Sequence, residues 1–128
     1  MTIRYDIDLK KNVIFMGAYG VIGVSDLAEV IADIESHPDV AGEMTLVLDL
    51  REIKRAFIVR ELDSLINLLA SEAKRFVSNY AFIVSIDTMN GVGRRFALKA
   101  VRKGLRLEVF NDYADAEKWL KWLLNARR

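Results

Sequence analysis

Hydrophobic positions near the start of the chain first repeat every two residues and then become continuous. Over residues 2–9 polar and apolar side chains alternate, which predicts a half-buried strand with one face in water. Residues 13–20 are almost entirely apolar, a pattern typical of a strand covered on both faces. The polar residues 10–12 between them have the length of a hairpin turn. We therefore expect an antiparallel pair with the first strand at the edge of a sheet.

Further along the chain the hydrophobic period becomes 3.6 residues, the period of a helix. The predicted helices run from Ser25 or Asp26 to about His37 and over residues 57–77, 92–103 and 112–126. Short apolar runs between these helices predict strands over residues 45–50, 80–86 and 105–110.

The resulting element order is β-β-α-β-α-β-α-β-α, which defines an α/β protein. Strands that alternate with helices favour parallel pairing through right-handed crossovers, and the opening hairpin adds one antiparallel strand. We expect a mixed, mostly parallel five-stranded sheet with about four helices. No internal repeat, linker or break in composition divides the chain, so residues 1–128 are predicted to form a single domain.

Composition narrows the classes of protein further. The chain is 52% hydrophobic and 29% charged, which excludes a disordered or low-complexity chain. It contains no cysteine, so disulfides, thiolate metal sites and cysteine nucleophiles are excluded. The longest uncharged stretch, residues 12–25, is too short to cross a bilayer, and residues 1–6 lack the layout of a signal peptide. We expect a cytoplasmic protein without a transmembrane segment.

Positive charge gathers in one segment, although the net charge is only +1. Residues 94–106 contain six bases and no acid. One face of the predicted helix carries Arg95, Lys99, Arg102 and Lys103, opposite Phe96, Ala97, Ala100 and Val101, which we expect to pack on the sheet. The basic face is either a partner surface or a solvated face balanced by acids elsewhere. No exposed aromatic residues interleave with these bases, so we expect no nucleic-acid partner.

Polar residues follow two of the predicted parallel strands, where ligands of α/β sheets usually bind. The candidates for a ligand or anion site are Asp49, Asp87, Asn90, Gly91, Gly93, Arg94 and Arg95. The two aspartates either hold a cation or exchange protons, or they cap turns. The segment 90–95 follows a strand and opens a helix, so its backbone N–H groups and arginines either bind a phosphate or form a simple turn.

Residues for catalysis are sparse. His37 is the only histidine and stands beside Pro38 at a helix exit, and the serines have no nucleophile-elbow or triad context. No cluster of histidines and acids predicts a metal site. We therefore expect no enzyme, no catalytic residue, no metal and no cofactor.

Three large apolar residues lie at the margins of the helical stripes, namely Leu68, Leu98 and Trp122. In the last helix Trp122 borders a stripe that includes Ala116, Trp119 and Leu120. Marginal residues of this kind are either partly exposed or form the surface of a dimer or partner contact.

Two segments of the sequence resemble a known family. Residues 107–120, Leu-Glu-Val-Phe-Asn-Asp-Tyr-Ala-Asp-Ala-Glu-Lys-Trp-Leu, are similar to the V-x-F … A-x-x-W-L ending of small bacterial SpoIIAA-like proteins, which are relatives of the STAS domain. Residues 45–50 resemble the central L-V-x-D-L strand of that family, and Asp49 matches its aspartate. The order of segments agrees over almost the whole chain.

This resemblance implies a mixed sheet backed by helices and a regulatory or interaction role without catalysis. The family's phosphorylatable serine lies in an I-D-S-S-G element after the aspartate-bearing strand, whereas residues 51–58 here contain no serine or threonine. We therefore do not expect that phosphorylation switch. The leading hypothesis is a regulatory, non-catalytic protein-interaction module that binds an unknown protein partner and forms a homodimer.

The alternative is a protein that binds a small molecule. The ligand would be either an anion at residues 91–95 or a lipid-like molecule in an apolar pocket under the helix 57–77. A third hypothesis is an enzyme that acts through Asp49 and Asp87.

Overall fold

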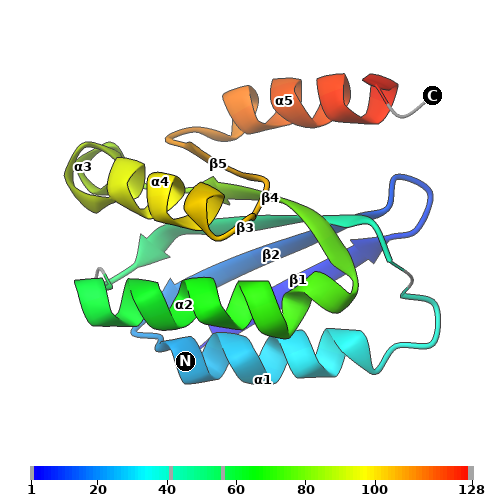
Figure 1. Cartoon of the computed structure of the whole chain (residues 1–128), viewed down its shortest axis with the longest axis horizontal. Coiled ribbons are helices and arrows are strands. Elements are labelled where there is room, and N and C mark those ends of the chain that lie inside the picture. Colours follow the sequence, from blue (N-terminus) through cyan, green and yellow to red (C-terminus); the bar gives the residue numbers. More distant parts are fainter. Residues whose placement is uncertain (1, 41, 56, 127–128) are drawn as a thin grey trace.

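The chain forms one five-stranded sheet with the strand order β1-β2-β3-β4-β5. The computed structural model describes residues 2–40, 42–55 and 57–126 (Figure 1). The strands are β1 (Thr2–Asp8), β2 (Val13–Gly20), β3 (Met44–Ile53), β4 (Val77–Ile83) and β5 (Leu107–Phe110). β1 pairs with β2 in antiparallel fashion, and the other neighbouring strands are parallel. The prediction of a mixed, mostly parallel sheet is therefore confirmed.

Helices cover the two faces of the sheet unequally, as Figure 1 shows. The helical segments are α1 (Val24–Glu35), α2 (Val59–Ser71), the 3₁₀ turn η1 (Ala73–Arg75), α3 (Ile86–Thr88), the π-helical turn η2 (Met89–Gly93), α4 (Arg94–Arg102) and α5 (Tyr113–Ala126). The larger core lies between one sheet face and α1, α2 and α4. A smaller core lies between the opposite face and α5. Most of the buried apolar surface thus lies on the side of α1, α2 and α4.

The opening hairpin has the register that its alternating pattern predicts. Tyr5 lies opposite Met16, and the pairing continues without a break from Thr2 to Asp8. Asn12 adopts a positive φ of 56° in the turn, a conformation that asparagine tolerates better than most residues. The alternating apolar residues of β1 pack against the larger core, so this strand is half-buried as expected.

Two predicted boundaries are wrong around the second long helix. α2 ends at Ser71 instead of continuing to residue 77, and β4 begins at Val77. Ala73 and Phe76 are nonetheless buried, so the hydrophobic period continues through the η1 turn although the backbone is no longer α-helical. Periodicity alone cannot separate these two cases.

α1 begins slightly earlier than predicted, at Val24. Asp26 is the third residue of this helix, and its carboxylate accepts a hydrogen bond of 2.8 Å from the Gly23 N–H. This bond satisfies a backbone donor that the helix itself leaves unpaired. Within the described residues, no helix is both long enough and apolar enough to cross a membrane.

Candidate functional site

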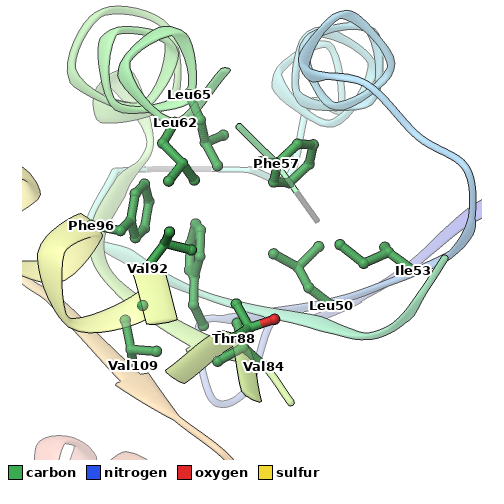
Figure 2. A pocket seen from close by; sticks show the side chains of 12 residues that line it. Leu50, Ile53, Phe57, Leu62, Leu65, Val84, Thr88, Val92, Phe96 and Val109 are labelled. Carbon is green, nitrogen blue, oxygen red and sulfur yellow. The ribbon is translucent and has the colours of Figure 1, made fainter. Parts of the chain in front are cut away.

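An apolar pocket lies at the carboxyl ends of the parallel strands, between the sheet, α2 and α4. Figure 2 shows side chains from these elements pointing toward a common space. The pocket is lined by Leu50, Ile53, Phe57, Leu62, Leu65, Phe82, Val84, Thr88, Val92, Gly93, Phe96 and Val109. Ligands of α/β sheets usually bind at this edge, so its position makes the pocket the first candidate for a functional site.

The pocket offers apolar contacts and little polar chemistry. Among the described residues that line it, Thr88 has the single polar side chain, and its hydroxyl accepts a hydrogen bond of 3.0 Å from Ser85 Oγ. The free space inside is about 30 Å³, enough for roughly one or two water molecules, whereas pockets for drug-sized ligands enclose roughly 300–1,000 Å³. In this state the pocket has room for the end of one inserted side chain.

One wall of the pocket depends on the η2 turn. Gly93 is buried at the end of this turn, and a Cβ added there would lie 3.1 Å from the carbonyl oxygen of Thr88 and 3.6 Å from Val109. The contact with the Thr88 carbonyl is tighter than a side chain normally tolerates, so the missing side chain of Gly93 lets the backbone of this turn close on itself, and Val109 of β5 lies at ordinary contact distance. π-helical turns of this kind occur frequently at functional sites.

Exposed apolar side chains adjoin the lining residues in the sequence. Ile58 and Val59 directly follow Phe57, and Ile86 lies between Val84 and Thr88. Each of these three residues is more than half exposed. We call Ile58, Val59 and Ile86 the apolar rim. Large exposed apolar residues that directly adjoin the lining of an apolar pocket are typical of a contact surface.

The loop that leads into the rim is held by charge. Arg55 donates two hydrogen bonds, of 2.8 and 3.0 Å, to the carboxylate of Glu61. The same carboxylate accepts a 3.0 Å bond from the Ile58 N–H at the start of α2. The hydrogen bonds from Arg55, and next that from Ile58, lower the pKa of Glu61 to about 2. These contacts fix the backbone on which Ile58 and Val59 are presented.

The structure places the two predicted aspartates in different surroundings. Partial burial raises the pKa of Asp49, but its hydrogen bonds with Arg51 outweigh this effect, so the net pKa is lowered. Arg51 binds both carboxylate oxygens, at 3.0 and 2.8 Å. Asp49 lines a groove beside Tyr113 at the start of α5, on the face away from the pocket. Asp87 is exposed in the first turn of α3.

The predicted helix start at residue 92 is wrong. The helical segment begins at Ile86 and is capped by Ser85, whose side chain accepts a bond from the Thr88 N–H. Residues 90, 91 and 93 lie inside the η2 turn, so they do not form a loop that opens a helix. This removes the backbone geometry on which an anion site at Asn90, Gly91, Gly93, Arg94 and Arg95 was predicted. Both arginines are exposed.

The basic face of α4 lies beside α2. A groove there is lined by Asp63, Ile66, Asn67, Lys99, Arg102 and Lys103. Lys99 forms an ion pair of 3.1 Å with Asp63, so an acid of the chain itself balances part of the basic face. Both side chains are about half exposed, and an exposed pair of this kind contributes little to stability.

The prediction that Val101 packs on the sheet is wrong. Phe96 and Ala100 are buried, whereas Val101 and its neighbour Leu98 are more than half exposed. Val101 follows Phe96 by five residues, which turns it about 140° around the helix from the buried side.

The predicted marginal residues divide into two groups. Leu98 and Trp122 are exposed, Trp122 to 64%. Leu68 packs against the larger core and lines a groove with Ile31 of α1. Trp119 is partly buried against Phe110, with ring centroids 5.9 Å apart. Leu98 and Trp122 therefore remain available for contacts, whereas Leu68 is largely used inside the fold.

Sequence reasoning missed a polar cluster that contains His37. The Tyr5 hydroxyl donates a 2.5 Å bond to Asp33 Oδ2 and lies 3.0 Å from His37 Nε2. The bond to Asp33, with a smaller effect of burial, raises the pKa of Tyr5. Tyr5 lies 28 and 32 residues from these partners, so no local motif could have revealed the cluster. It ties β1 to α1.

Comparison with known proteins identifies the fold. No protein-family profile matches the sequence, and no curated protein matches it at a significant level. Among solved structures, an uncharacterised protein of the DUF3478 family from Shewanella loihica, described as having a SpoIIAA-like fold, superposes with a TM-score of 0.57. The match has 16% identity and covers 92% of this chain and 93% of that chain.

This likeness establishes the fold class that the sequence resemblance implied. The chain has a SpoIIAA-like α/β fold, with its strand order and mixed sheet as described above.

Proposed function

We propose that the protein is a non-catalytic, regulatory interaction module that binds a protein partner through the apolar rim and the pocket beside it. The observation that carries the proposal is the exposure of Ile58, Val59 and Ile86 next to residues that line a small apolar pocket. Apolar side chains around a concave site are typical of the centre of a protein contact.

The shape of the site favours a protein partner. A space of about 30 Å³ accepts the end of one apolar side chain, and the rim supplies the surrounding contacts. The SpoIIAA-like fold supports the same proposal, because the resemblance to that class implies regulation through protein contacts.

The test compares two double variants in affinity capture from the native cells. Ile58→Asp with Ile86→Asp places two charges on the rim. The matched control, Leu98→Asp with Val101→Asp, changes two residues of equal exposure on α4. We expect the rim variant to capture about tenfold less partner, or even less, because its new charges would be buried unpaired in the contact. The control should capture as much partner as the wild type. Loss in the control alone would place the contact on α4 instead.

A second candidate function is the binding of a lipid-like molecule in the same pocket. The observation that favours it is the lining, in which eleven of the twelve described residues have no polar side chain. Such a ligand would require α2 and α4 to move apart, because the present space is small. Native mass spectrometry of gently purified protein tests this function. A bound mass of a few hundred daltons would support it, and the mass of the chain alone would contradict it.

A further inference from the structure

β1 is an edge strand whose outer side has no partner among the described strands. It is seven residues long and pairs with β2 in an unbroken register. Natural edge strands are usually protected from pairing by proline, charged side chains (lysine above all), a bulge or very short length. Residues 2–8 contain no proline and no lysine, their charges are of both signs, and the pairing of β1 shows no bulge. This edge therefore presents an open row of backbone donors and acceptors.

The side chains of β1 form two separate rows. Ile3, Tyr5 and Ile7 pack against the larger core and are only partly buried. Arg4 and Asp6 are exposed, and neither side chain makes a hydrogen bond or ion pair with any other described residue. The bonds of Tyr5 to Asp33 and His37 hold its side chain on α1. Two opposite charges thus stand unpaired on the edge strand, two positions apart.

When two copies of β1 pair side by side, one register places these opposite charges against each other. In an antiparallel pair with Tyr5 opposite Tyr5, Arg4 of each copy faces Asp6 of the other, and Ile3 faces Ile7. Directly opposed residues of unlike charge stabilise a strand pair. A shift centred on Arg4 places Arg4 opposite itself and forms no unlike pair. A shift centred on Asp6 pairs Arg4 with Asp8 but places Asp6 opposite itself, so both shifts oppose like charges, whereas the register centred on Tyr5 opposes none. The pattern therefore favours one self-complementary register.

We propose that the protein forms a homodimer through antiparallel pairing of β1 with β1 of a second copy, with Arg4 and Asp6 as reciprocal cross-strand pairs. The two sheets then become one continuous sheet across a two-fold axis. This interface uses the β1 edge, whereas the rim adjoins the carboxyl ends of β3 and β4, so the inference goes beyond the proposed function and does not depend on it.

Charge reversal tests the interface by sedimentation equilibrium. We expect wild-type protein to dimerise, and Arg4→Asp or Asp6→Arg to raise the dimer dissociation constant about tenfold or more, because each creates two like-charge pairs. The double variant with both changes restores unlike charges and should regain the wild-type constant. Glu108→Arg reverses an exposed charge on the opposite edge strand β5 and should have no effect.

Mixing the two single variants gives the sharpest result. At positions 4 and 6 the Arg4→Asp protein carries two acids and the Asp6→Arg protein carries two bases, so an equal mixture should form heterodimers although neither variant dimerises well alone. Hydrogen exchange of the wild type should also show β1 amides that gain protection as concentration rises. A monomeric wild type, a dimer unaffected by the single changes, or a mixture without heterodimers would overturn the proposal.

Discussion

At the scale of single residues, the two glycines of the η2 turn have opposite surroundings. A Cβ at Gly93 would lie 3.1 Å from the Thr88 carbonyl oxygen, whereas a Cβ at Gly91 would have no atom within 4 Å. We expect Gly93→Ala to destabilise the fold by about 1–2 kcal/mol, because backbone cannot easily move aside. Gly91→Ala should stabilise it by roughly 0.5–1 kcal/mol through helix propensity. Chemical denaturation measures the free energy of unfolding of both variants, and equal effects would contradict the close approach of Gly93 to the Thr88 carbonyl.

The Arg55–Glu61 pair gives a prediction on pH. The folded pKa of Glu61 is about 2, below the ordinary value of 4.5, so the ionised carboxylate favours the folded state. The contribution of Glu61 to the free energy of unfolding is fully present above pH 4.5 and is lost as pH falls toward 2. We expect Arg55→Ala to raise the pKa of Glu61 in an NMR titration and to shift this loss to higher pH. The remaining bond from the Ile58 N–H should keep the pKa below 4.5.

Arg60→Ala is the matched control for this titration. Arg60 also lowers the pKa of Glu61, but its effect is the smallest of the causes. The pKa of Glu61 should therefore move much less than in Arg55→Ala. If the two changes moved it equally, the hydrogen bonds of Arg55 would not be what holds the loop before the rim.

At the scale of elements, the orientation of α5 is tested by its two tryptophans. Trp119 is partly buried against Phe110, whereas Trp122 is 64% exposed. We expect Trp119→Ala to lower the free energy of unfolding by about 2–3 kcal/mol, somewhat less than the loss for a fully buried tryptophan. Trp122→Ala should change the free energy of unfolding by no more than about 0.5 kcal/mol. Thermal or chemical unfolding distinguishes them, and a reversal of the two costs would mean that α5 presents its other side to the sheet.

Helices and strands were predictable from the sequence wherever a single hydrophobic pattern dominated a segment. The alternation in residues 2–9 and the apolar run in residues 13–20 specify a hairpin, and its register follows from which side must be buried. The segment around η2 gave no such signal, because its two glycines are weak helix formers and indicate a turn. The cap by Ser85 is a local contact with the Thr88 N–H three residues on, whereas the position of Gly93 beside Val109 of β5 depends on a contact that a local pattern does not contain.

At the scale of the whole molecule, the fold was predictable but most of the candidate site was not. The order of strands and helices follows from short-range patterns and fixes the sheet's carboxyl edge. The pocket joins Leu50, Phe82 and Phe96, which are far apart in the sequence and look like ordinary core residues. The rim was likewise hidden, because Ile58 and Val59 continue the apolar pattern of α2 and only the three-dimensional structure reveals their exposure.

The two proposed surfaces belong to different parts of the same sheet. The rim and pocket lie beside the ends of β3 and β4, and the self-complementary edge is β1, separated from them by β2. A dimer through β1 would therefore carry two copies of the rim, both free for partners. Paired sites raise the apparent affinity for a partner that is itself paired.

Site-specific photocrosslinking in the native cells tests the central claim most directly. A photoreactive phenylalanine derivative at position 58 keeps the rim apolar, and the same group at position 118, an exposed residue of α5, is the control. The account predicts a discrete protein adduct from position 58 and none from position 118. An adduct from position 118 alone, equal adducts from both positions, or only a small-molecule adduct at position 58 would contradict it.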